Sequence, residues 1–546
     1  MKKYILPILL ILIVPILYAM PPMPGSGHTH DGSIREGEEF PVNFYSQSLS
    51  SDNEVRQASA SFPVSVSTTG NKKILVVLVD YPDLPFNYNT FGADTHDKEY
   101  YDKLLQAPSG LTMQKYYYEQ SRKKLNLSFH VIGPYTASND YAHYGANDAA
   151  GNDIGAAELV SEILGKIDGS AVPVGMDNCT VIIVHSGPGE EAGKNNPPLY
   201  ADAENCIWSQ RDKISKYDFD PVTISKTTFD DFLIVPEYSY YSKEGTFEAT
   251  IGVFCHEFGH ILGLPESYDR YYATTGVGQW SLMAGGSWGS TGKAGIAPGA
   301  DPAPFMAWEL LALGWIDEED ITPDSGTAAT YSFSNINDAK KVYSVKLTDE
   351  QYLILEGKAE NTAEGSMYVM ETGLMITHVH KGILSKYWSS NSINSSSYRP
   401  HGAMVVEAEA SNYKTNGLGN LWRSGLTDSN RFTTKALFRS DTLTSVSPSG
   451  TAAVASGFLI GILAAWYRGR KKLCALLAVI ALVTLISTGC VISAGGGGGT
   501  YDTGPNTNYY TNMSNVHSKT GNSGISIYNI KCNSDGSGSF TIRREE

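Results

Sequence analysis

Uninterrupted apolar runs alternate with amphipathic stretches through the first half of the chain. Residues 74–79 (ILVVLV) are apolar and β-prone, which is typical of a strand buried on both faces of a sheet. A helix is predicted over residues 113–124. Similar apolar runs predict further strands at residues 125–132, 180–185 and 232–235. Strands that alternate with helices predict an α/β (α+β) domain, which we place at residues 71–325.

The pattern changes after residue 325. Short runs in which apolar and polar residues alternate are separated by turn residues: KVYSVKL, QYLILEG, GLMITHVH and AMVVEAEA. A period of two is typical of strands, so we expect a β-rich C-terminal part of the region at residues 326–445. His378 and His380 alternate within one of these strands without a spaced partner, and we interpret both as structural.

A helical period replaces the strand pattern at residues 247–262. With about 100° between successive residues, bulky side chains fall on one face of the predicted helix: Phe247, Ile251, Phe254, Phe258 and Ile261. The opposite face has small residues and two histidines: Ala249, Gly252, His256, Gly259, His260 and Gly263. Small residues leave room for another group to approach the histidines, which a merely packed pair would not need.

The two histidines have the spacing of a metal site. His256 and His260 are i and i+4 neighbours, so both imidazoles can bind one tetrahedral ion. Glu257 lies about 100° around the helix from His256, where it can reach a water on the ion without taking a ligand position. The set predicts a Zn²⁺ site with Glu257 as the catalytic base, and a purely structural pair of histidines is the alternative.

The next residues supply a third ligand. The helix is expected to end at Gly263, because glycine accepts the left-handed conformation found just past a helix and Pro265 cannot continue it. The turn would bring Glu266 back under the metal. The spacing H-E-x-x-H-x-x-G-x-x-E matches the metzincin pattern, except that an acidic residue replaces the last histidine. Glu266 is therefore the predicted third ligand, and Asp269 is the alternative.

Two sulfur-containing residues lie near this motif. Met283 is in the turn GQWSLMAGGSWG, where the metzincin pattern expects a methionine beneath the zinc. Alone it would be interpreted as core filling, and it supports the site because it follows the zinc motif. Cys255 is next to His256 but lies to the side of the ligand face, so we expect a small buried thiol there.

The N-terminal residues suggest export. Residues 1–19 have two lysines followed by an apolar run, as in a signal peptide, and a buried core helix is the alternative. The Pro-, Gly- and Ser-rich residues 20–70 are interpreted as a leader or propeptide. In the oxidising compartment that export implies, Cys179 and Cys206 could pair.

The C-terminal residues suggest a membrane anchor. Two apolar stretches, residues 452–467 and 473–492, flank a basic cluster, and the second is long enough to span a bilayer. Positive charge between them predicts a transmembrane hairpin over residues 452–492 with a cytoplasmic turn. The Gly/Ser/Asn-rich tail, residues 493–546, would then lie outside, with the protein exported and anchored at the cell envelope. Lipid attachment at Cys490 is the alternative.

The composition and the net charge of the chain argue against one class of binding partner. Of the 546 residues, 42% are hydrophobic and 18% are charged, as in globular proteins, and the formal net charge is −16. Nucleic-acid-binding proteins usually carry a basic face, so we expect no nucleic-acid partner. The loop HSGPGEEAG contains Glu190 and Glu191, and we interpret it as a solvated acidic loop because it lacks the spaced ligands of a calcium loop. Binding of Ca²⁺ as a second ion is the alternative, because loop carboxylates suit hard cations.

Seven segments resemble the immune inhibitor A family of secreted metallopeptidases over roughly residues 72 to 440: ILVVLVDYPDLPF, MQKYYYEQSRKKL, VIIVHSGPGEEAG, CIWSQRD, HEFGHILGLPESYD, GQWSLMAGGSW and PFMAWELLALGWI. The resemblance implies a metzincin-like catalytic domain, with a twisted sheet above the cleft and the H-E-x-x-H helix at its floor. It implies zinc binding by His256 and His260, catalysis by Glu257 and the Met-turn role for Met283. The family usually has aspartate where this chain has Glu266, and the two apolar segments are not part of its pattern.

These expectations describe a zinc-dependent endopeptidase that hydrolyses peptide bonds of extracellular proteins. Its partners would be protein or peptide substrates and, through the C-terminal apolar segments, a membrane. Two alternatives stand beside it. One is a surface adhesive or scaffold protein with a vestigial protease domain. The other is a zinc hydrolase of a non-peptide substrate, because zinc-activated water also attacks other carbonyls.

Overall fold

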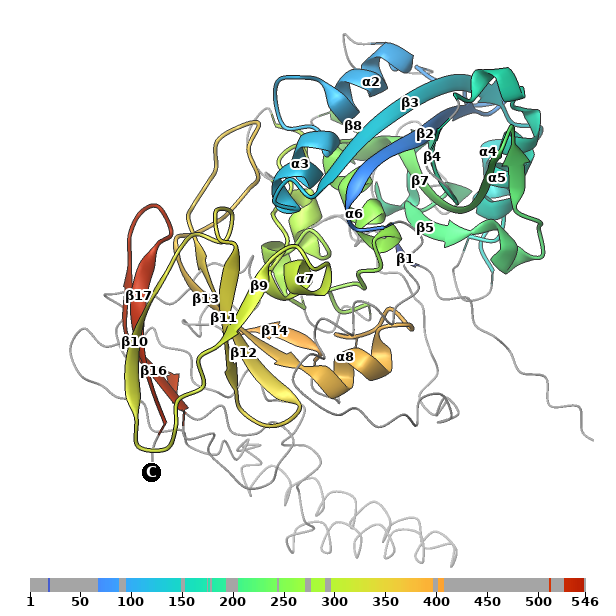
Figure 1. Cartoon of the computed structure of the whole chain (residues 1–546). Helices are drawn as coiled ribbons and strands as arrows, with labels where there is room; N and C mark the ends of the chain where they lie inside the picture. Colours follow the sequence, from blue (N-terminus) through green and yellow to red (C-terminus); the bar gives the residue numbers. More distant parts are fainter. Residues whose placement is uncertain are drawn as a thin grey trace, which may run out of the picture.

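The computed structural model describes a large part of the chain: residues 67–87, 95–148, 153–173, 175–176, 179–192, 205–242, 245–270, 276–289, 296–395, 401–406 and 525–544, with the short strands 18–19 and 510–511. Two larger sheets and one small sheet organise these residues into a mixed α/β structure. Helices α6 (Ile251–Ile261) and α7 (Ala307–Ala312) lie between the two larger sheets (Figure 1).

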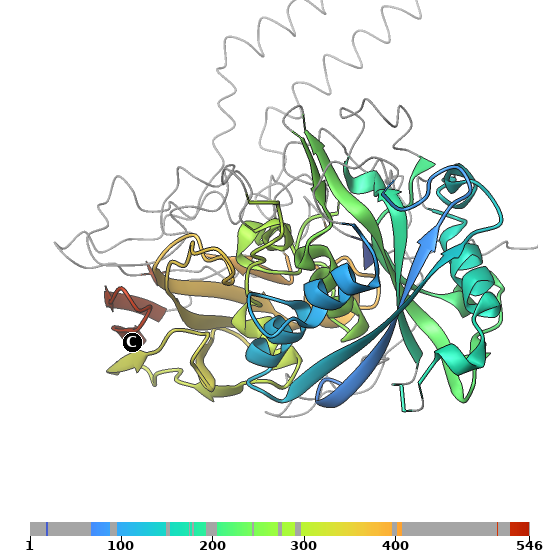
Figure 2. The same cartoon turned by 90° about the horizontal axis from the view of Figure 1, so that it is seen from above.

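The first sheet is twisted, as Figure 2 shows, and combines parallel with antiparallel strands. Its parallel core has the order β7-β4-β2-β3, formed by β2 (Gly70–Asp80), β3 (Leu125–Thr136), β4 (Cys179–Pro188) and β7 (Thr227–Ser242). Antiparallel strands pair with β7: β5 (Gln210–Lys213), β6 (Val222–Ile224) and β8 (Gly245–Glu248). The short strand β1 (Tyr18–Ala19) pairs with β5 at the edge. The four strands predicted in this region are confirmed.

Helices cover both faces of this sheet because successive side chains of a strand point to opposite sides. Leu75, Val77 and Val79 pack on the side of α5 (Ala156–Lys166). Ile74, Val76 and Leu78 belong to the other core, with α2 (Lys98–Gln106), α3 (Met113–Gln120), α6 (Ile251–Ile261) and α7 (Ala307–Ala312). All six of these strand residues are fully buried, which confirms the prediction of burial on both faces.

Two predicted helix boundaries are wrong. The helix predicted over residues 247–262 begins only at Ile251, because Phe247 pairs with Tyr240 in the β7–β8 hairpin and Thr250 is the extended N-cap. The helix predicted over residues 113–124 ends at Gln120. Arg122 and Lys123 have left-handed backbones, with φ of 57° and 65°, which stops the helix before β3.

The second sheet confirms the β-rich part. The four predicted runs form β11 (Lys341–Lys346), β12 (Gln351–Lys358), β13 (Gly373–His380) and β14 (Ala403–Val405), in the order β14-β13-β12-β11-β9 with β9 (Asp317–Asp320) at the end. Helix α8 (Lys381–Tyr387) follows β13. Residues of β12, β13 and β14 share one hydrophobic core with α6 and α7, and the second sheet contacts α7 through β12.

Part of the predicted Gly/Ser/Asn-rich tail, residues 493–546, is folded into strands. Strands β16 (Ile525–Cys532) and β17 (Gly538–Arg544) form a hairpin, and β17 pairs with β10 (Ala328–Phe333), beside which it is drawn in red (Figure 1). This small sheet, which also includes β15 (Tyr510–Thr511), packs on the second sheet. Alternating apolar residues give the hairpin a buried face, which the overall Gly/Ser/Asn content obscured: Ile525, Ile527, Ile530, Phe540 and Ile542.

We expect removal of residues 521–546 to destabilise the folded protein by several kcal/mol. Five large apolar side chains leave the core in this truncation, and each is worth about 1.5–3 kcal/mol when buried. Calorimetry of the full chain and the truncated chain measures the effect, and a chain that ends at Arg544 is the control. An unchanged melting temperature would contradict this packing.

Within the described residues, no helix is long and apolar enough to cross a membrane. The predicted transmembrane hairpin at residues 452–492, the alternative lipid site at Cys490 and most of the predicted signal peptide and leader lie outside the described residues. These remain predictions.

Candidate metal centre

Helix α6 presents two imidazoles from its last two turns. His256 and His260 are buried, and their ring centroids are 4.9 Å apart. The Nδ1 atom of His256 is 2.7 Å from the carbonyl oxygen of Leu282, and that of His260 is 2.7 Å from the carbonyl oxygen of Leu264. A hydrogen bond from Nδ1–H to a carbonyl fixes the tautomer that leaves Nε2 as the metal ligand.

The chain turns after α6 and places Glu266 against both histidines. Gly263 has φ of +94°, as expected for a glycine just past a helix end. The two oxygens of the Glu266 carboxylate lie 3.1 Å from His260 Nε2 and 3.3 Å from His256 Nε2. The ligand atoms of His256, His260 and Glu266 all lie within 4.8 Å of one another. Asp269, the alternative third ligand, is buried but is not in this group.

The electrostatics of these residues suit a divalent cation. Burial lowers the pKa of His260, which favours the neutral imidazole that a metal requires. Burial would raise the pKa of Glu266, but the two imidazoles outweigh it and lower that pKa to about 2. The buried Nε2 atom of His256 makes no well-formed hydrogen bond, although Glu266 Oε2 lies 3.3 Å away. Two neutral imidazoles and one carboxylate, arranged with Nε2 atoms facing inward, are a donor set that fits tetrahedral Zn²⁺.

Met283 lies directly against the helix between the two histidines. A Cβ atom on Gly259 would collide with the Met283 sulfur. The Met283 amide donates to Ser281 Oγ, and its carbonyl oxygen accepts from the Ser267 amide. A Cβ atom on Gly252 would meet the Ser287 carbonyl oxygen. The small face of α6 therefore makes room for the protein's own Met-turn, in addition to the space at the histidines.

The remaining residues of the motif take distinct places. Glu257 is fully buried on α6 beside His256 and does not belong to the three-ligand group. Cys255 is also fully buried, and burial raises the pKa of its thiol well above the usual range. A neutral thiol is a poor metal ligand, which agrees with the prediction that Cys255 only fills space.

The region that contains this site matches a known protein family. Residues 61–178 and 168–316 match the family described as immune inhibitor A peptidase M6, catalytic domain. This stretch includes α6, Glu266 and the Met283 turn. The matched region belongs to the immune inhibitor A family of metallopeptidases.

Two curated relatives agree with the family. The chain is similar to the pre-pro-metalloprotease PrtV of Vibrio cholerae serotype O1, with 31% identity over 310 residues that cover 48% of this chain and 32% of the relative. Immune inhibitor A of Bacillus thuringiensis subsp. alesti is 29% identical over 287 residues, which cover 43% of this chain and 38% of the relative. The chain thus spans about a third of the length of these relatives.

In this immune inhibitor A-like region, the sheet edge near the metal centre accepts an extended backbone. Strand β5 packs against α6 and is antiparallel to β7. Tyr18 and Ala19, at the end of the predicted signal peptide, pair antiparallel with Arg211 and Gln210 of β5. Strand β5 is thus hydrogen-bonded to β7 on one side and to Tyr18 and Ala19 on the other, next to the metal-binding helix.

The acidic loop of the immune inhibitor A-like region is not solvated. Glu190 and Glu191 are buried together with Asp153, so the interpretation of a solvated loop is wrong. Burial raises the pKa of Glu191 to about 7, and burial together with Glu190 raises the pKa of Asp153. The buried Oδ1 atom of Asp153 and Oε1 atom of Gln210 have no hydrogen-bond partner.

Other residues singled out from the sequence lie away from the metal. His378 is 3.0 Å from Gln351 across the β12–β13 pair, and His380 accepts from the Ile383 amide at the start of α8, which agrees with structural roles. Cys206 is buried, and the side chain of Cys179 lies outside the described part of the structure, so the predicted pairing of the two cysteines stays a prediction.

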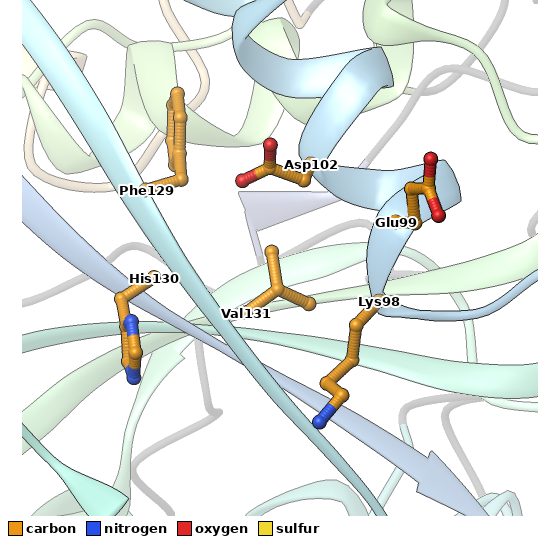
Figure 3. A pocket seen from close by; sticks show the side chains of 6 residues that line it. All are labelled: Lys98, Glu99, Asp102, Phe129, His130 and Val131. Carbon is orange, nitrogen blue, oxygen red and sulfur yellow. The ribbon is translucent and has the colours of Figure 1, made fainter.

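A shallow depression of about 300 Å³ lies between α2 and β3. Its lining, drawn in Figure 3, contains none of the predicted site residues: Lys98, Glu99, Asp102, Phe129, His130 and Val131.

The residues that hold the segments around Glu266 and Met283 in place could not be identified from the sequence. Glu309 of α7 accepts hydrogen bonds from Ser267 and Ser281, which flank Glu266 and Met283 respectively. Asn391 contacts Glu266 from 125 residues farther along the chain. Periodicity and motif spacing relate residues that are close together in the sequence, so neither could reveal partners that come from distant segments. The one hint in the sequence was the segment PFMAWELLALGWI, which contains Glu309 and is among the segments that resemble the family.

Proposed function

We propose that the protein is a zinc-dependent endopeptidase that hydrolyses peptide bonds of extracellular proteins. The observation that carries the proposal is the convergence of His256 Nε2, His260 Nε2 and the Glu266 carboxylate, all buried, above Met283. Its location in a region of the immune inhibitor A family supports peptides as the substrate class.

The proposed chemistry assigns one role to each residue. When bound, Zn²⁺ lowers the pKa of a water molecule towards about 7 and polarises the scissile carbonyl. Glu257 accepts a proton from the water and passes it to the leaving amine. His256, His260 and Glu266 hold the ion, and Met283 supports the helix beneath it. The low pKa of Glu266 keeps this ligand ionised across the physiological range.

The substrate would bind as an extended strand. Strand β5 offers an edge beside α6, and its pairing with Tyr18 and Ala19 supports its use by a peptide backbone. Main-chain hydrogen bonds to such an edge select extended, unfolded segments with little regard to side chains. We further propose export and anchoring at the cell envelope, which rest on the apolar segments of the sequence.

Cleavage of a denatured protein mixture tests the function. The full chain loaded with Zn²⁺ is compared with the metal-free chain, and the new N-termini are identified by mass spectrometry. Zinc-dependent internal cuts would support an endopeptidase. Hydrolysis of small esters without peptide cuts would support the alternative zinc hydrolase. Bound zinc without either activity would support the vestigial protein.

We also propose that Ca²⁺ binds at the buried acidic cluster of Asp153, Glu190 and Glu191. The three carboxylates are buried, and burial together with the charges of Glu190 and Glu191 raises the pKa of Asp153. Their oxygens do not converge within 4.8 Å of one another as the zinc ligands do, so a hard cation would have to draw them closer as it offsets their repulsion. The acceptor atoms Asp153 Oδ1 and Gln210 Oε1 are available to it.

We expect Ca²⁺ to raise the melting temperature of the zinc-loaded protein and Asp153→Asn to abolish this response. A ligand that binds only the folded state stabilises it by mass action. Differential scanning fluorimetry across a calcium titration measures the shift, with Asp349→Asn, whose side chain is 96% exposed, as the control. An identical response in both variants would contradict a site at this cluster.

A further inference from the structure

A short segment of the second sheet's unit holds the loop that carries Glu266. We call residues 388–395 the clamp segment and residues 263–270 the ligand loop. Four hydrogen bonds join them: Trp388 Nε1 to Gly263 O at 2.8 Å, Glu266 N to Asn391 Oδ1 at 2.6 Å, Asn394 Nδ2 to Ser267 O at 2.8 Å and Arg270 N to Ser395 Oγ at 3.1 Å. The bonds are distributed from one end of the ligand loop to the other.

Asn391 makes the contact to the ligand residue itself. Its side chain is fully buried, and its Oδ1 atom accepts the backbone amide of Glu266. Its Nδ2 atom lies 3.5 Å from Glu266 Oε1, on the carboxylate that also faces the two imidazoles. Asn391 has φ of +50°, a left-handed conformation that asparagine tolerates better than most residues. Backbone and side chain of Glu266 are thus both in contact with one residue.

The clamp segment is fixed to the second sheet. Asn394 Oδ1 accepts the amide of Ala403, the first residue of β14. The Gly402 amide donates to the carbonyl oxygen of Ile393, whose side chain is fully buried. The family match ends at residue 316, so the clamp segment lies beyond the matched catalytic region. The position of Glu266 therefore depends on a part of the chain that the motif does not include.

We propose that Asn391 is a positioning residue for the third metal ligand, so that the β-rich unit completes the metal centre of the catalytic region. The inference rests on the proposed function for the identity of the ion. Outer contacts that orient a ligand typically change metal affinity about 10–100-fold when removed. A glutamate side chain has several rotatable bonds, and holding it before the metal binds removes part of the entropic cost of ordering it.

The test compares Asn391→Gly with Asn394→Ala in the full chain. Glycine accepts the left-handed backbone at position 391 and removes only the amide side chain. Asn394→Ala breaks the bonds of the same segment to Ser267 and Ala403 but leaves the contact with Glu266. Zn²⁺ affinity is measured by chelator competition, the melting temperature of the metal-free protein by calorimetry, and kcat and KM on a peptide.

We expect Asn391→Gly to weaken Zn²⁺ binding about 10–100-fold and to lower kcat at sub-saturating zinc with little change in KM. Asn394→Ala should lower the melting temperature comparably but shift zinc affinity less than about threefold. Equal zinc affinities for Asn391→Gly and wild type, or equal weakening by both variants, would overturn the proposal. Zinc binding without peptide cleavage in the wild-type protein would contradict the proposed function but would not contradict the positioning role of Asn391.

A measurement on the unaltered protein covers the case in which Asn391→Gly does not fold. Hydrogen exchange of the Glu266 amide in the zinc-free chain should be slow, because Asn391 Oδ1 holds it at 2.6 Å without help from the metal. Exchange at the rate of an exposed amide would overturn the proposal.

Discussion

Glu257→Gln abolishes peptide cleavage and leaves the zinc in place. Glu257 is fully buried beside His256 and outside the three-ligand group, so the substitution removes a proton acceptor without removing a ligand. General-base catalysis typically contributes about 10²–10⁴-fold, and we expect kcat to fall by at least that factor. Steady-state kinetics on a peptide and zinc analysis of the purified variant provide the two measurements.

A nearby carboxylate serves as the control. Glu248 precedes α6, is about one-third exposed and faces His96 rather than the ligands. Glu248→Gln should keep both zinc and turnover. Wild-type turnover in Glu257→Gln would contradict the proposed mechanism, whereas loss of zinc in that variant would make Glu257 part of the metal shell.

Glu266→Ala removes zinc binding, and Asp269→Asn does not. The Glu266 carboxylate contacts both imidazoles, and its removal leaves two protein ligands for an ion that needs three. Loss of a residue that only orients a metal ligand lowers metal affinity by up to about 100-fold, and we expect Glu266→Ala to lower zinc affinity by more than that. Asp269 is equally buried but lies outside the ligand group, so Asp269→Asn should retain near-normal affinity.

Chelator competition on both variants decides between the two acidic residues. The melting temperature of each metal-free variant is measured in parallel, because both side chains are buried. Retained affinity in Glu266→Ala together with lost affinity in Asp269→Asn would assign the third ligand to Asp269 and contradict the geometry described above.

Local patterns predicted the elements that local forces determine. The run at residues 74–79 predicts a doubly buried strand, and the His256–His260 spacing places two imidazoles on one side of a helix. Gly263 and Pro265 predict the turn that returns the chain to the site. These features depend on residues within one turn or one strand, where periodicity carries the information.

Long-range pairing could not be predicted in the same way. The hairpin of β16 and β17 pairs with β10 across some 200 residues, and its alternating isoleucines stand among glycine, serine and asparagine. Phe247 has the period of the helix, but pairing with Tyr240 assigns it to β8. Asn391 belongs to no recognisable sequence motif, and it reaches Glu266 only when the chain is folded.

The central claim is that His256, His260 and Glu266 bind one zinc ion, and anomalous diffraction at the zinc edge tests it most directly. For crystals of the zinc-loaded protein, we predict a single strong peak about 2.0–2.2 Å from His256 Nε2, His260 Nε2 and one Glu266 carboxylate oxygen. A peak at Asp269 in place of Glu266, or no peak between the two imidazoles, would contradict the account.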